Sequence, residues 1–236
     1  GLWMTPKPNK PSYFQHTWVK RFDGIGEPRW DQVFFGGGHN TRALHGTPEG
    51  TFVAPGKYII GPPERNRARW IELDPAGRWL RDAPMDPTDA TDECAGQALA
   101  PHDDGFLVVG TAWPDDSPIR DGYIGATNRK GTQLLPQMAI GGPATDWLHD
   151  VVRTSAGWVV VGESQPADGE TRAWVVMLDA IDSVASSQAY LFGDSSALSA
   201  VIALNSGAVA MFGDAQTGTD TDALLIVAGP DGNFCK

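Results

Sequence analysis

Residues 157–162 read GWVVVG, a short apolar run that ends in glycine, and runs of the same kind recur along the chain. The glycines that end these runs are separated by 49, 52 and 51 residues; they are Gly61, Gly110, Gly162 and Gly213. The residue that opens the next apolar strand keeps the same period, at Trp18, Trp70, Tyr123, Trp174 and Leu224. A period near fifty residues, made of strands alone, predicts propeller blades or a β-solenoid rather than a helical array.

A short turn segment follows each strand that the second landmark opens. Asp, Asn and Gly tolerate positive φ or hydrogen-bond their own backbone, which is typical of hairpin turns. The segments are 23–26 (DGIG), 74–77 (DPAG), 128–131 (NRKG), 179–182 (DAID) and 229–232 (GPDG). Each full unit is therefore expected to hold four strands. In the third repeat we expect them at 147–153, 158–161, 174–178 and 184–192.

The repeats occupy most of the 236 residues, so we expect one all-β domain. Prolines among polar residues predict an extended Pro-rich strap over 1–17. A leading half-unit then covers 18–37, and repeats cover about 38–85, 86–140, 141–192 and 193–236. The predicted fold class is a β-propeller of four-stranded antiparallel blades, with about five blades or as part of a larger propeller. Since the first and last units do not complement each other cleanly, an irregular ring, a longer chain and completion by another subunit all stay open.

Composition excludes some function classes. The net charge of -11 and the lack of a basic stripe argue against nucleic-acid binding, which depends on clustered Lys and Arg. No apolar run approaches the roughly twenty residues that span a bilayer, so any membrane association is expected to be peripheral. Two cysteines, Cys94 and Cys235, do not make a disulfide scaffold. Acidic repeats rich in Trp and Gly with little cysteine favour an exported protein that is periplasmic, on the cell surface or extracellular.

The repeats resemble a family of bacterial propeller repeats that share the line DGG-x-V-V-x-G, D-x-W-V-x-K-x-D-x-x-G and W-x-x-x-x-G-G. The matching segments are 105–110 (GFLVVG), 157–162 (GWVVVG), 173–179 (AWVVMLD), 18–23 (WVKRFD) and 30–37 (WDQVFFGG). Such repeats occur in secreted and surface proteins of bacteria. The resemblance implies a propeller and implies no particular reaction, because function depends on sites placed on such folds.

One face of the propeller is the candidate binding surface. The loops between second and third strands, and those between repeats, emerge there and are the long ones in this chain. Trp113 lies in such a loop and is a candidate carbohydrate platform. His149 alternates with Trp147 along a first strand, and with Asp146 it is a candidate acid and base at the central channel. The alternative is that these polar loops only form solvated turns. The candidate ligand-binding residues are Trp113, Asp115, Asp116, Arg120, Asp146, Trp147 and His149.

Two acidic runs are weak calcium candidates, because calcium prefers several carboxylate and carbonyl oxygens. The candidate ligands are Asp86, Asp89 and Asp92 in the first run and Asp220 and Asp222 in the second. Neither run has a defined ligand spacing, so we expect no cofactor, with calcium possible. The two cysteines are expected on opposite faces, which favours free thiols or an intermolecular bridge over a mutual disulfide.

No nucleophile, base and orienting residue can be assigned from the sequence. The leading expectation is therefore a non-catalytic exported propeller that acts as a structural or protein-binding subunit of a larger assembly. Its partners would be proteins or further repeats of a longer chain. Two alternatives stay open: a propeller that binds glycans, with or without calcium, and a hydrolase or other enzyme with a site at the channel mouth.

Overall fold

The computed structural model describes residues 2–7, 10–34, 43–47, 49–60, 65–85, 93–103, 105–113, 119–130, 133–134 and 138–230. Over these residues the regular structure is β, in five antiparallel sheets that follow one another along the chain. Sheet A holds β1 (Leu2–Lys7), β2 (Lys10–Phe22) and β3 (Pro28–Phe34); sheet B holds β4 (His45–Gly46), β5 (Phe52–Ile60), β6 (Arg65–Leu73) and β7 (Trp79–Met85); sheet C holds β8 (Glu93–His102), β9 (Gly105–Trp113), β10 (Asp121–Asn128) and β11 (Met138–Ile140); sheet D holds β12 (Asp146–Thr154), β13 (Gly157–Ser164), β14 (Arg172–Ala180) and β15 (Ser183–Tyr190); sheet E holds β16 (Ser195–Ala203), β17 (Val209–Thr217) and β18 (Asp220–Ala228).

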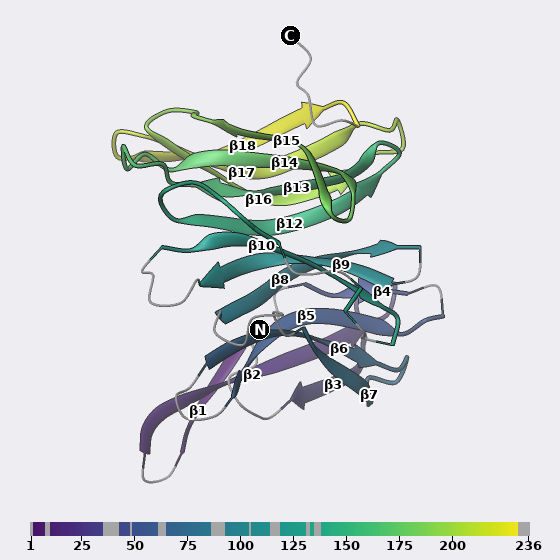
Figure 1. Ribbon diagram of the computed structural model, residues 1–236. Helices are drawn as coiled ribbons and strands as arrows, with labels where there is room; N and C mark the ends of the chain where they lie inside the picture. Colours follow the sequence, from purple (N-terminus) through teal and green to yellow (C-terminus); the bar gives the residue numbers. More distant parts are fainter. Residues whose placement is uncertain are drawn as a thin grey trace.

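The sheets stack in chain order, with sheets A and E at opposite ends of the stack (Figure 1). Neighbouring strands within each sheet are neighbours in sequence, as in the blades of a propeller. A separate apolar cluster joins each sheet to the next one along the chain. The described sheets thus form an open, propeller-like stack, and the expected all-β class with antiparallel blades is confirmed.

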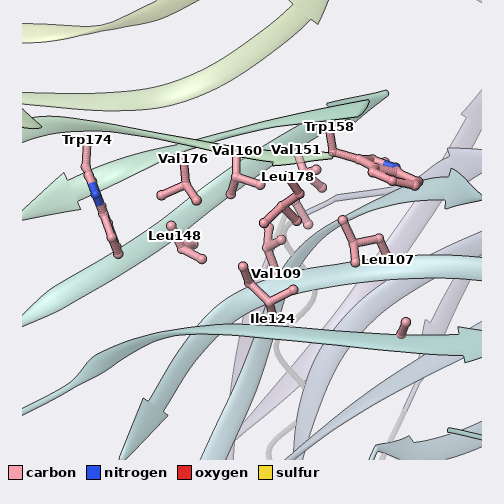
Figure 2. Close-up of a cluster of buried hydrophobic side chains, with 13 residues drawn as sticks. Leu107, Val109, Ile124, Leu148, Val151, Trp158, Val160, Trp174, Val176 and Leu178 are labelled. Atoms are coloured by element: carbon pink, nitrogen blue, oxygen red, sulfur yellow. The ribbon is translucent and has the colours of Figure 1, made fainter. Parts of the chain in front are cut away.

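The stacking explains why β13 is apolar throughout its centre. Trp158 and Val160 pack in the cluster between sheets C and D, whereas Val159 and Val161 pack between sheets D and E. Successive side chains of a strand point to opposite faces, so a strand buried on both faces is a continuous apolar run. Figure 2 shows the cluster between sheets C and D, to which sheet C contributes Leu107, Val109 and Ile124.

The aromatic landmark residues pack between sheets, as their single position in each repeat predicts. Trp70 and Tyr123 lie in the cluster between sheets B and C, and both are buried. Trp174 is buried in the cluster between sheets C and D. These three residues are therefore structural.

A β-bulge in the first strand of the blade accounts for the repeat glycine. The register between β12 and β13 shifts between Leu148 and Asp150, which leaves His149 as the extra residue. Opposite this point a Cβ on Gly162 would lie 1.9 Å from the carbonyl oxygen of Trp147, so only glycine allows the strands to approach so closely. The same arrangement recurs in sheets C and E, where the extra residues Gln97 and Ser199 lie near Gly110 and Gly213.

Two of the predicted turn segments have the expected chemistry. In the 74–78 turn, Asp74 Oδ1 accepts hydrogen bonds from the backbone N–H groups of Ala76 and Arg78, and Gly77 has a φ of 80°. The 23–27 turn repeats this pattern with Asp23 and Gly26. Asx turns of this kind close hairpins with a residue in the left-handed region.

The structure differs from the sequence expectation at the N-terminal end of the described chain. Residues 2–7 and 10–17 form β1 and the start of β2 rather than a separate strap, because β1 pairs with β2 and extends the leading half-unit into a three-stranded sheet. Proline is tolerated there because Pro6 lies on the edge strand and Pro11 beside a register irregularity. The fourth strand of sheet C is described over Met138–Ile140. Phe234 and Cys235, which belong to the last predicted repeat, lie outside the described residues.

No helix long and apolar enough to cross a bilayer is present in the described part of the chain.

Candidate functional site

A pocket of about 370 Å³ lies where sheets B, C and D meet. The lining residues lie at one end of the sheets. The β9–β10 connection and the connection into β12 emerge at this end, which is the face expected to bind ligands. The polar and aromatic residues that line it are Lys57, Gln97, Thr111, Trp113, Arg120, Trp147, His149 and Glu163.

Equivalent positions of two blades supply most of this lining. In sheet D, Trp147 and Glu163 are directly opposite each other on β12 and β13, and the bulge adds His149. In sheet C, Ala95 and Thr111 occupy the same paired positions 52 residues earlier, and the bulge adds Gln97. The scaffold thus repeats while the side chains that it presents to the pocket change from blade to blade, which is how a repeat fold builds a specific site.

His149 and Glu163 form an acid–base pair in the pocket. Nε2 of His149 lies 3.4 Å from Oε1 of Glu163, at hydrogen-bond distance. The side chains retain 21% and 23% of their accessible surface, so both are sheltered yet within reach of a ligand. A histidine oriented by a carboxylate is able to accept and return a proton during a reaction.

Arg120 lies between two tryptophan rings at the pocket. Its guanidinium carbon is 5.2 Å from the ring centroid of Trp113 and 5.7 Å from that of Trp147. These cation–π contacts hold a positive charge in a fixed place. No acidic side chain forms an ion pair with Arg120 over the ranges that the structure covers.

Two buried polar atoms of the lining have no hydrogen-bond partner among the described residues. Oγ1 of Thr111 is one, in a residue that is 1% exposed, and Oε1 of Gln97 is the other. Since buried polar groups are nearly always paired in folded proteins, these two atoms are places where a ligand is able to bind.

A carboxyl pair lies next to the pocket and does not line it. Asp146 is 1% exposed and alternates with Trp147, so it is directed away from the pocket; its Oδ2 accepts a hydrogen bond from the N–H of Gly142. Burial, followed by the charge of Asp146, raises the pKa of Asp121. Asp146 does not line the pocket, and the acid that hydrogen-bonds His149 is Glu163 rather than the expected Asp146.

The structure brings four of the sequence candidates into one pocket: Trp113, Arg120, Trp147 and His149. Asp115 and Asp116 lie outside the described residues. Sequence reasoning missed Lys57, Gln97, Thr111 and Glu163. A signal for two of these existed, because Thr111 and Glu163 directly follow repeat glycines and interrupt otherwise apolar strands.

The candidate metal ligands do not form a site in the described residues. Asp220 and Asp222 are exposed at the start of β18, and Asp86, Asp89 and Asp92 lie outside the described residues. No group of three or more His, Cys, Asp or Glu residues is arranged to hold a metal ion in the part of the chain that is described. Calcium therefore stays a prediction.

Cys94 is a buried free thiol at the start of β8. Its Sγ accepts a hydrogen bond from the N–H of Ala68, at 3.2 Å. Cys235 lies outside the described residues, so the prediction about its partner stays a prediction.

Neither a protein-family model nor a curated protein matches the sequence. Solved structures do match the fold. A protein of unknown function from Bacteroides caccae has a TM-score of 0.58 and 11% identity, over 94% of this chain and 74% of its own. The periplasmic gluconolactonase of Pseudomonas aeruginosa has a TM-score of 0.52 and 14% identity, over 92% and 64%. A putative glycoside hydrolase from Parabacteroides distasonis has a TM-score of 0.50 and 10% identity, over 99% and 84%.

These matches establish an all-β, propeller-like fold, and they correct one expectation. The prediction of a non-catalytic structural or protein-binding subunit, and with it the prediction that the protein is not an enzyme, is wrong, because structures similar over nearly the whole chain are named as enzymes. His149 and Glu163 are 14 residues apart and are brought together by the pairing of β12 with β13, and the sequence analysis did not pair them.

Proposed function

We propose that this protein is a hydrolase that cleaves an ester bond of a carbohydrate derivative, with sugar lactones as the first substrates to test. The observation that carries the proposal is the hydrogen bond between His149 and Glu163 in a pocket flanked by tryptophan rings. The names of two similar structures, a gluconolactonase and a putative glycoside hydrolase, agree with a carbohydrate substrate.

The proposed reaction uses the His149–Glu163 pair. In the tautomer whose Nε2–H donates to Glu163, Nδ1 of His149 is the nitrogen that accepts a proton from water. The water oxygen attacks the carbonyl carbon of the lactone, the ring C–O bond breaks, and the imidazolium returns the proton to the oxygen that leaves. The Glu163 carboxylate orients the ring and stabilises its charged form, as the acid of a catalytic triad does.

Glycoside hydrolysis fits the described pocket less well. Most glycosidases use two carboxyl groups, about 5–5.5 Å apart in retaining enzymes and about 6.5–9.5 Å apart in inverting ones. Among the described lining residues, Glu163 is the only carboxylate. The neighbouring acid Asp146 is buried and faces away, so one carboxylate with one histidine favours cleavage of an ester.

We also propose that the protein is exported and that its blades belong to a propeller of about five or more blades. The repeat pattern supports the blade number, and the name of the periplasmic gluconolactonase supports export. Protein partners or further repeats that complete the propeller stay predictions of the sequence.

The test is hydrolysis of D-glucono-1,5-lactone and D-galactono-1,4-lactone by the purified chain, followed in a pH-stat and corrected for spontaneous opening. We expect turnover above that background. His149→Asn should lower kcat by a factor of about 10²–10⁴, the usual contribution of a general base. Glu163→Gln should also lower kcat.

Glu170→Gln is the matched control for Glu163→Gln, because Glu170 is exposed in the β13–β14 connection and pairs with Arg172. This variant should retain wild-type kcat. Cleavage of p-nitrophenyl glycosides without lactone hydrolysis would replace the proposal with a glycosidase, and inactivity on both classes would refute an enzyme of either kind.

A further inference from the structure

The charged side chains that line the pocket have a net positive charge, whereas the chain as a whole is acidic. The whole chain carries a net charge of -11, with 29 acidic residues. The charged residues that line the pocket are two cations, Lys57 and Arg120, and one carboxylate, Glu163, which already hydrogen-bonds His149. A cleft whose lining carries a net positive charge attracts anionic ligands.

Arg120 is fixed and has spare hydrogen-bonding capacity. The rings of Trp113 and Trp147 flank its guanidinium, which restricts the side chain before any ligand arrives. A guanidinium presents several N–H groups in a planar fork that matches the two oxygens of a carboxylate. Among the described residues none supplies such a carboxylate to Arg120.

Arg153 also packs on a tryptophan ring, but an acidic side chain neutralises its charge. Arg153 lies 5.5 Å from the ring centroid of Trp158, and it forms an ion pair with Asp103 at 2.8 Å. The protein therefore provides an acidic partner for an arginine that only packs on a tryptophan. Arg120 differs in that it lines a pocket and has no such partner in the described part of the chain.

We infer that the pocket binds a carbohydrate that carries a carboxylate group, with the guanidinium of Arg120 as the anchor for that carboxylate. The inference rests on the proposed function, which gives sugar lactones as the class of substrate. It narrows this class to lactones of sugar acids that keep a second, free carboxylate. The reacting ester would then lie beside His149 while the free carboxylate binds Arg120.

The rest of the lining suits the other groups of such a molecule. Oγ1 of Thr111 and Oε1 of Gln97 are buried without a partner among the described residues, and sugar hydroxyls both donate and accept hydrogen bonds. Leaving such atoms unpaired is costly, so a ligand that satisfies them gains affinity. The apolar faces of sugar rings pack on tryptophan, which Trp113 and Trp147 supply.

The experiment measures binding by titration calorimetry with two matched pairs: D-glucuronate against D-glucose, and D-galacturonate against D-galactose. None of these is an ester, so turnover does not interfere. We expect at least one uronate to bind about tenfold or more tightly than its neutral partner, the size expected of a charge-assisted hydrogen bond. Added salt should weaken the uronate only.

Arg120→Gln should abolish the preference for the uronate while the affinity for the neutral sugar changes little. Arg153→Gln is the matched control, because it removes the same charge from the same kind of tryptophan contact outside the pocket, and it should keep the preference. If Arg120→Gln fails to fold, Arg120→Lys keeps the charge without the planar fork and should retain only part of the preference.

Equal affinity for the uronate and the neutral sugar in both pairs would overturn the inference, as would a preference that survives Arg120→Gln, or no binding at millimolar concentration. The two proposals fail separately. Hydrolysis of neutral lactones without a uronate preference refutes the inference alone. A uronate preference without hydrolysis of any lactone, that of D-glucaro-1,4-lactone included, refutes the proposed function alone.

Discussion

The carboxyl groups of Asp121 and Asp146 lie close together beside the pocket, where sheets C and D meet. A Cβ on Gly141 would touch an oxygen of each of them, at 2.5 Å from Asp146 and 2.7 Å from Asp121. Burial and the charge of its neighbour raise the pKa of Asp121, so the folded protein keeps this proton at a higher pH than the unfolded chain does. Ionisation of Asp121 therefore works against folding.

Asp121→Asn should change the dependence of stability on pH. The favourable contribution of protonated Asp121 is complete below the unfolded pKa of about 3.9, and it is lost as the pH rises through the raised folded pKa. The free energy of unfolding of the wild type should therefore fall relative to that of Asp121→Asn between pH 3.5 and pH 7. Urea denaturation at pH 3.5, 5 and 7 measures this difference.

Asp222→Asn, a change of the same kind at an exposed position of β18, is the control and should show no such trend. If the difference between the wild type and Asp121→Asn is constant over this pH range, the interpretation of the carboxyl pair is incorrect.

Within a blade, the bulge of β12 decides which side chains reach the pocket and which reach the next sheet. It adds His149 to the pocket side and sets the position of Asp150, whose Oδ2 accepts a hydrogen bond from the N–H of Val201 in β16. Burial is the main reason that the pKa of Asp150 is raised. One irregular position thus supports both the site and the contact between sheets D and E.

Gly162→Ala should disrupt this bulge. The new Cβ would lie 1.9 Å from the carbonyl oxygen of Trp147, so the backbone has to move, and overpacking of this kind costs about 1–3 kcal/mol. We expect lower stability in urea and a loss of turnover, because His149 and Trp147 shift with the strand. Gly24→Ala is the control: no atom lies within 4 Å of its Cβ position and its φ is not positive. Similar stability of the two variants would show that the bulge does not depend on glycine.

Across the whole molecule, cohesion comes from sheets that pack on their neighbours in sequence (Figure 1). Leu148 is fully buried between sheets C and D, near Val109 and Ile124. At the end of the stack, one face of sheet E packs on sheet D and the other exposes apolar side chains. These are Ile202, Phe212, Leu225 and Val227. An exposed apolar face of this kind is typical of a surface that is covered in the working protein.

Leu148→Ala should therefore cost about 2–5 kcal/mol in the free energy of unfolding, because it opens a cavity between two sheets. The same change at Leu225, which is 63% exposed, should stay within about 0.5 kcal/mol. Urea denaturation of the two variants measures both values. A similar cost at the two positions would mean that the end face of sheet E is buried in solution, and that the protein associates through it.

The strands and turns were predictable from local patterns. In the third repeat the expected ranges 147–153, 158–161 and 174–178 fall within β12, β13 and β14. This succeeds because alternation in a strand, the Asx turn and the close approach that requires glycine each depend on residues near in sequence or directly paired.

The pocket could not be predicted in the same way, because its members are distant in sequence and meet only when the blades stack. Lys57 and Glu163 belong to sheets B and D, and both line the cavity at which sheet C meets them. The repeat pattern alone therefore specified the blades and the face on which a site would lie. The pairing of β12 with β13 decided that His149 meets Glu163, and the packing of three blades decided that Lys57 and Arg120 line one cavity with this pair, since these neighbours depend on strand register and on how the sheets stack.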